Sequence, residues 1–109
     1  MGIICMEIQQ SIDAERVVLV LRGDLNHCAH QTFMRVIHSL SPDTRCTIHL
    51  DMVASIDSAG LGMLLVLFEQ LGSKPKTVLL CNPCRQVAGA LRNSNFYALF
   101  EIRDDCPMR

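Results

Sequence analysis

Three short apolar runs, separated by segments with helical periodicity, constrain the fold of this chain more than any other feature. The runs are RVVLVLRG (residues 16–23), RCTIHLDM (45–52) and KTVLLC (76–81). A continuous run of β-branched residues and leucine, such as the first, is typical of a strand buried on both faces of a sheet. Strands that alternate with helices pair in parallel through right-handed crossovers. The pattern therefore predicts an α/β fold.

Two further strands are predicted at the ends of the chain. Residues 4–9 alternate apolar and polar side chains, as in a strand with one solvated face, and YALFEIR (97–103) reads as a short closing strand. With three helices between the strands, the predicted order is β-β-α-β-α-β-α-β. We expect a mixed, mostly parallel sheet packed against helices on one or both faces.

The three helices are predicted from their start and stop signals. Asn26 is the expected N-cap of the first helix, whose apolar residues recur at helical spacing up to residue 40. The second helix is expected from Ser58 to residue 71, before a glycine. The third is expected to open with Asn82 as N-cap and Pro83 at its first position.

Length and charge limit the classes of function. The chain has 109 residues, of which 50% are hydrophobic, and we expect one domain over residues 1–109 with a core at about 3–103. Its formal net charge of −1 is not typical of a nucleic-acid-binding protein. A protein or small-molecule partner is therefore expected.

The expected location follows from the absence of targeting signals. The N-terminus lacks a basic region and a long apolar stretch, so it does not read as a signal peptide. The longest apolar run, residues 59–68, is too short to span a bilayer. We therefore expect a cytoplasmic protein without direct membrane insertion, whose six cysteines are reduced thiols.

Ser58 lies where small polar residues give way to the apolar second helix, and three roles compete for it. It could cap the helix, as Asp57 also could. A nucleophile is disfavoured, because the G-x-S-x-G pattern is absent and none of the four histidines lies in a recognisable catalytic context. The third role is that of a phosphorylation target, since a helix N-terminus tolerates a phosphate. Ala59 and Gly60 leave the backbone there uncovered.

The motif IDSAGLG (56–62) closely resembles the phosphorylation motif of STAS domains, specifically the bacterial anti-sigma factor antagonists. VLVLRGDLN resembles the second strand and acidic turn of that family, and TIHLDMVASIDSAGLG its third strand and switch loop. VLLCNPCRQVAGALRNSNFYALFEI is similar in layout to its strand, helix and last strand. The resemblance covers residues 3–103.

The resemblance implies a switch and a substrate for phosphorylation, not an enzyme. Ser58 would be the phosphoacceptor for an anti-sigma factor that is itself a protein kinase. The unmodified protein would bind this kinase and release the sigma factor, and a PP2C-type phosphatase would reset the modified form. The implied partner-binding residues are Asp24, Asn26, Asp57, Ala59, Gly60 and Leu61. No cofactor or metal is implied.

Two other functions stay open at this stage. Some STAS domains are accessory subunits of lipid ABC transporters or parts of stress-signalling complexes, in which the helix at Ser58 would dock without being modified. The second alternative is a cysteine-based redox or zinc protein, suggested by CNPC (81–84). A zinc site would need a second ligand pair, and HCAH (27–30) has no usual half-site spacing. The family resemblance does not account for the six cysteines.

Overall fold

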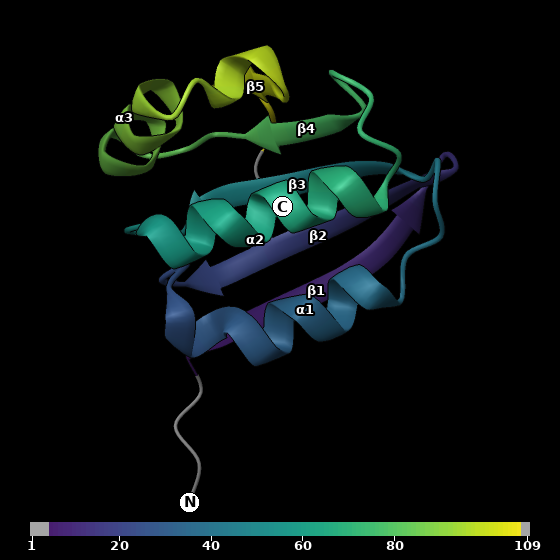
Figure 1. Ribbon diagram of the computed structural model, residues 1–109, viewed down its shortest axis with the longest axis horizontal. Helices are drawn as coiled ribbons and strands as arrows, with labels where there is room; N and C mark the ends of the chain where they lie inside the picture. Colours follow the sequence, from purple (N-terminus) through teal and green to yellow (C-terminus); the bar gives the residue numbers. More distant parts are fainter. Residues whose placement is uncertain (1–4, 108–109) are drawn as a thin grey trace, which may run out of the picture.

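The predicted alternation of strands and helices forms a five-stranded sheet in the order β1-β2-β3-β4-β5 (Figure 1). The computed structural model describes residues 5–107. The strands are β1 (Met6–Asp13), β2 (Arg16–Gly23), β3 (Arg45–Met52), β4 (Val78–Cys81) and β5 (Glu101–Arg103). β1 and β2 pair antiparallel, and β2 to β5 pair in parallel. The predicted mixed, mostly parallel sheet is confirmed.

The helices cover one face of this sheet. They are α1 (His30–His38), α2 (Ser58–Gln70) and α3 (Arg85–Asn93), with short 3₁₀ turns η1 (His27–Ala29) and η2 (Phe96–Ala98). Figure 1 shows α1 and α2 side by side on one face, and α3 packs against η2 at the β4–β5 end of the molecule. The predicted strand at residues 4–9 extends partly outside the described residues.

The core lies between the sheet and α1 and α2. Phe33 of α1 and Leu64 of α2 are fully buried, as are Ile48 and Leu50 of the central strand β3. The opposite side of β3 is also covered, because His49 is only 4% exposed. His49 was predicted to be a hydrogen-bonded core residue. It is buried, but among the described residues its Nδ1 makes no hydrogen bond and lies 3.5 Å from Oδ1 of Asp51.

The predicted start of the third helix is wrong by two residues, because Cys84 is the N-cap and Arg85 the first helical residue. Asn82 has left-handed backbone geometry (φ 57°), which asparagine tolerates better than most residues. Its side-chain amide donates to Asp51 Oδ2 at 2.8 Å and to the backbone oxygen of Cys106 at 2.9 Å. Asn82 therefore ties the end of β3 to the C-terminal segment, and α3 starts only at Arg85.

The last strand is shorter than YALFEIR suggested. Its first residues form η2, and only Glu101–Arg103 pair with β4. The reason is aromatic packing, because the ring centroids of Phe96 and Phe100 lie 5.5 Å apart and Phe100 lies 5.7 Å from Phe68. The turn of η2 brings both rings into the core, where an extended chain would separate them.

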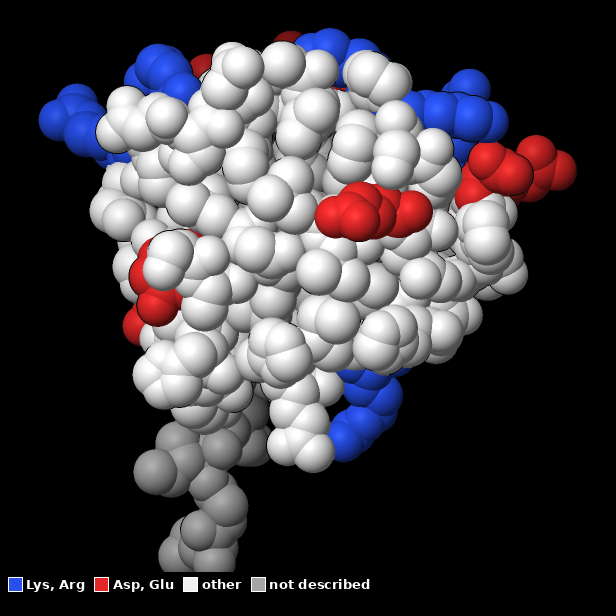
Figure 2. Space-filling model, in the orientation of Figure 1, with Lys and Arg blue, Asp and Glu red and all other residues white. Residues whose placement is uncertain are grey.

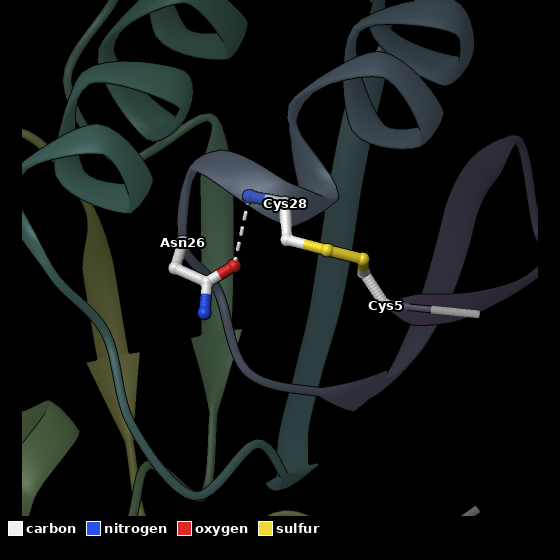
Figure 3. The surroundings of a disulfide bond; sticks show 3 residues. All are labelled: Cys5, Asn26 and Cys28. Atoms are coloured by element: carbon white, nitrogen blue, oxygen red, sulfur yellow. Dashed lines mark hydrogen bonds between the residues drawn. A yellow bond between two sulfur atoms is a disulfide. The ribbon is translucent and has the colours of Figure 1, made fainter. Parts of the chain in front are cut away.

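The expectation that all six cysteines are reduced thiols is wrong for one pair. A disulfide joins Cys5, just before β1, to Cys28 in η1 (Figure 3). The pairing is a consequence of the antiparallel register, which places Met6 opposite Gly23 at the end of β2. The chain turns into η1 shortly after Gly23 and brings Cys28 beside Cys5. The other four cysteines are free.

Cys46 in β3 is expected to make folding stability sensitive to alkali. Burial raises the pKa of its thiol to about 12, against a smaller lowering by Arg16. The folded protein therefore keeps a proton that the unfolded chain loses near pH 9, so unfolding becomes easier as the pH rises from about 9 towards 12. We expect Cys46→Ala to flatten this decline, by roughly 1 kcal/mol per pH unit.

Denaturant unfolding of wild type and Cys46→Ala at a series of pH values measures the difference. Cys84→Ala, which removes a half-buried free thiol, is the control and should keep the wild-type slope. Equal slopes for wild type and Cys46→Ala would contradict the prediction.

Candidate functional site

Two segments meet where β2 and β3 end, at the carboxyl edge of the sheet. Residues 24–26 follow β2, and residues 53–57 follow β3. Leu25 and Ile56 form a parallel bridge. The backbone N–H of Leu25 donates to Ser55 O at 3.0 Å, and the N–H of Asp57 donates to Leu25 O at 3.3 Å. The structure therefore brings the segment that holds Asp24 and Asn26 against the residues that lead into α2.

Asp57, and not Ser58, caps α2. The Asp57 backbone is extended (φ −119°, ψ −171°), and its Oδ1 accepts a hydrogen bond from the N–H of Gly60 at 3.0 Å. Ser58 is the first helical residue and is exposed. Within residues 5–107 no hydrogen bond involves its hydroxyl. The interpretation of Ser58 as the helix cap is therefore wrong, and its hydroxyl is available to solvent.

Gly60 lets the start of α2 approach the neighbouring segment closely. A Cβ at this position would overlap the carbonyl oxygen of Leu25 and lie 2.7 Å from Cγ1 of Ile56. Two residues further on, a Cβ on Gly62 would meet nothing within 4 Å. The close packing therefore requires a glycine at position 60 but not at position 62. Leu61, between them, is half-buried and packs against the core.

Asn26 caps η1, as predicted for the first helix. Its Oδ1 accepts a hydrogen bond from the N–H of Cys28 at 3.0 Å (Figure 3). This bond orients the chain as it leaves the segment beside α2. Asp24, on the other side of Leu25, is exposed.

Gln86, in the first turn of α3, is a positioning residue that the sequence did not suggest. Its Oε1 accepts from the N–H of Ile56 at 3.0 Å, and its Nε2 donates to Ile56 O at 3.3 Å. The thiol of Cys84 adds a weak contact to Ala54 O at 3.4 Å. Residues 53–57 are thus held between the segment at Leu25 and α3. Gln86 has no sequence signal, because it lies 30 residues away and resembles any polar helix residue.

Gln86→Ala is expected to lower the free energy of unfolding by about 1–3 kcal/mol. The change leaves both backbone groups of the buried Ile56 without their partner. Arg85→Ala is the matched control, because it truncates a long exposed side chain in the same helical turn. Denaturant unfolding of both variants tests the difference. Equal free energies of unfolding for the two variants would contradict the prediction, because water would then satisfy the Ile56 backbone groups as well as the Gln86 amide does.

The exposed face of α2 adds apolar surface beside Ser58. Leu65 and Val66 are 36% and 37% exposed. Leu65 lies seven residues after Ser58, so the two share one face of the helix. Figure 2 views the molecule from the side of α1 and α2 and shows few charged residues on that face. A weakly charged surface with exposed apolar side chains is suited to contact with a protein partner.

A metal site and thiol chemistry at the CNPC motif both have little geometric support in the described residues. Among them, no three His, Cys, Asp or Glu side chains gather as metal ligands. Of the CNPC cysteines, Cys81 is buried, and burial above all raises the pKa of its thiol to about 12. In the described part of the chain, no helix is long and apolar enough to cross a membrane.

Known proteins share this fold. The family model of the STAS domain matches residues 4–106. A STAS-domain-containing protein of Pseudomonas aeruginosa (strain UCBPP-PA14) is 30% identical over 93 residues, which cover 84% of this chain and 92% of that protein.

Two solved structures have the same arrangement of elements. A proposed anti-sigma factor antagonist from Thermotoga maritima superposes with a TM-score of 0.74 at 22% identity, covering 89% of this chain and 86% of the other. The anti-sigma factor antagonist SpoIIAA, in its unphosphorylated form, superposes with a TM-score of 0.70 at 19% identity, covering 91% and 90%. At these identities the likeness establishes the fold alone.

Proposed function

Because this chain belongs to the STAS domain family, we propose that it is an anti-sigma factor antagonist switched by phosphorylation of Ser58. The observation that carries the proposal is the hydroxyl of the exposed Ser58 at the first position of α2, which makes no hydrogen bond to any of residues 5–107. The structural relatives named as anti-sigma factor antagonists support the same class of function.

The position of Ser58 suits a reversible negative charge. A phosphoserine carries roughly −1.5 to −2 charges at neutral pH. The N-terminus of α2 has free N–H groups and a partial positive charge that tolerate this addition within the folded protein. The Asp57 carboxylate lies on the next residue. Phosphorylation would therefore concentrate negative charge at one point of the surface without unfolding the helix.

The same addition would oppose binding of a partner that covers this surface. In the proposal, an anti-sigma factor with kinase activity contacts residues 24–26 and the start of α2, including Ala59, Gly60 and Leu61. The exposed Leu65 extends the contact along the helix. Binding such a partner would bury the phosphate and strip it of water, which costs free energy. An acidic partner surface would add electrostatic repulsion. Phosphorylation would thus release the partner.

The partners supply the chemistry in this scheme. The kinase transfers phosphate to Ser58, a PP2C-type phosphatase removes it, and this chain acts as a binding module in the bacterial cytoplasm. Its single domain corresponds to residues 1–109. No nucleic-acid contact is needed for regulation of transcription, because the sigma factor is released from the kinase.

Phosphorylation in source-cell lysate tests the proposal. Purified wild type, Ser58→Ala and Ser55→Ala are incubated with lysate and ATP, and phosphopeptides are mapped by mass spectrometry. We expect phosphate on Ser58 in wild type and Ser55→Ala, and none on Ser58→Ala. Ser55 is the matched control, because it lies in the same loop three residues earlier.

A pull-down with the same proteins identifies the partner. Recovery of a small ATP-binding kinase by wild type supports the proposal. Recovery of a membrane ATPase subunit, with no phosphate on Ser58, would instead assign the chain to a transporter complex.

A further inference from the structure

The disulfide between Cys5 and Cys28 lies at the surface beside the proposed partner site. The Cα atoms of the two cysteines are 5.6 Å apart, inside the usual range of roughly 4.4–6.8 Å. Cys28 is exposed and Cys5 half-buried, so a thiol in solution can reach the bond. Of the free cysteines, Cys46 and Cys81 are buried.

This bond is not needed to build the core. Small domains use disulfides when their apolar core is insufficient. Here Ala29 and Phe33, which follow Cys28, are fully buried, and Met6, which follows Cys5, is 4% exposed. Hydrophobic packing thus anchors both chain segments, while neither Cys5 nor Cys28 belongs to the buried core. Accessible disulfides of this kind are the ones that exchange and regulate, whereas structural ones resist reduction.

The bond is connected to the partner site through a short path. The N–H of Cys28 donates to Asn26 Oδ1 at 3.0 Å (Figure 3). Asn26 follows Leu25, whose backbone bonds to Ser55 and Asp57 at the start of α2. The disulfide therefore fixes the far end of the segment that lies against residues 55–57. Without it, residues 26–28 keep the cap of η1 but lose their covalent tie to β1.

We propose that Cys5 and Cys28 form a reversible redox site that sets how firmly residues 24–28 are held against residues 55–57. The disulfide form holds the surface beside Ser58 in one arrangement, and reduction by a dithiol loosens it. The inference rests on the proposed function only in taking this surface as the partner site.

The chemistry is a two-electron thiol–disulfide exchange. A thiolate of the dithiol attacks the Sγ of the exposed residue Cys28, the Cys5–Cys28 bond breaks, and Cys5 leaves as a thiolate that takes a proton. The second thiol of the dithiol, as a thiolate, then attacks the mixed disulfide and releases Cys28, which is protonated in turn. The dithiol becomes a disulfide, and the protein gains two thiols.

Alkylation and hydrogen exchange on the isolated chain test the inference. After mild oxidation with a disulfide buffer, denaturing alkylation should label four cysteines and leave Cys5 and Cys28 unlabelled; dithiothreitol should make all six reactive. Reduction should also speed amide exchange at Leu25 and Asp57 by roughly tenfold. Exchange in the buried part of α2, at Met63 and Leu64, should stay unchanged.

Cys5→Ser and Cys28→Ser are matched controls, because each removes the bond from a different side. Both should show the fast exchange of the reduced protein, and dithiothreitol should have no further effect on either. Labelling of Cys5 and Cys28 after oxidation would overturn the inference, and so would equal exchange in the two redox forms. No partner enters this test, so failure of the proposed kinase interaction gives a separate result.

Discussion

Ser58→Asp is expected to weaken binding of the proposed anti-sigma kinase by roughly 100-fold or more, whereas Ser58→Ala is expected to bind like wild type. The Ser58 hydroxyl makes no hydrogen bond within residues 5–107, so its removal in Ser58→Ala should change neither the stability nor the structure of the protein. A carboxylate at the same place adds a charge next to Asp57 that a partner would have to desolvate. A buried, poorly paired charge at an interface costs several kcal/mol, and each 1.4 kcal/mol is about tenfold in affinity.

Ser58→Asn is the control that separates charge from shape, because asparagine matches aspartate in size and lacks its charge. Isothermal titration of the purified kinase with wild type and the three variants measures the effect. We expect Ser58→Asn to lose far less affinity than Ser58→Asp. Equal losses for the two would show that side-chain size opposes binding. Wild-type affinity for Ser58→Asp would contradict a phosphorylation switch at this position.

Gly60→Ala is expected to lower the free energy of unfolding by roughly 2–3 kcal/mol, although alanine is the better helix former. The added methyl group would overlap the carbonyl oxygen of Leu25, which belongs to the backbone and cannot rotate away. The start of α2 would have to move outward. That movement would stretch the hydrogen bond from the Asp57 N–H to Leu25 O. Partner binding should fall as well, because the two segments of the site would separate.

Gly62→Ala is the matched control, in the same helix and two residues further on. A Cβ there meets nothing within 4 Å, so the expected effect is a gain of roughly 0.5–1 kcal/mol from helix propensity. Denaturant unfolding of the two variants gives the comparison directly. If both substitutions raised the free energy of unfolding, the structure around Gly60 would be able to accommodate a methyl group at little cost, contrary to the prediction.

Local sequence signals identified most of the secondary structure. The alternation of buried strands and helical segments predicted the parallel part of the sheet, and Asn26 was recognised as a cap. Helix-cap signals were less reliable where more than one residue could act as the cap, or where the candidate residue had another partner. Asp57 and Ser58 are both suitable caps, and only the backbone geometry selected Asp57. Asn82-Pro83 is a common helix start, yet here Asn82 binds Asp51 and Cys106, which lie far away in the sequence.

The sequence by itself determined the α/β class, the order of the elements and the position of Ser58 near the start of a helix, because hydrophobic periodicity and capping are local properties. Only the tertiary structure decided which side chains meet at the candidate site. Gln86 holds Ile56 from 30 residues away, and Cys5 meets Cys28 because two antiparallel strands bring them together. Such contacts depend on register and helix packing, and neither is encoded in the neighbouring residues.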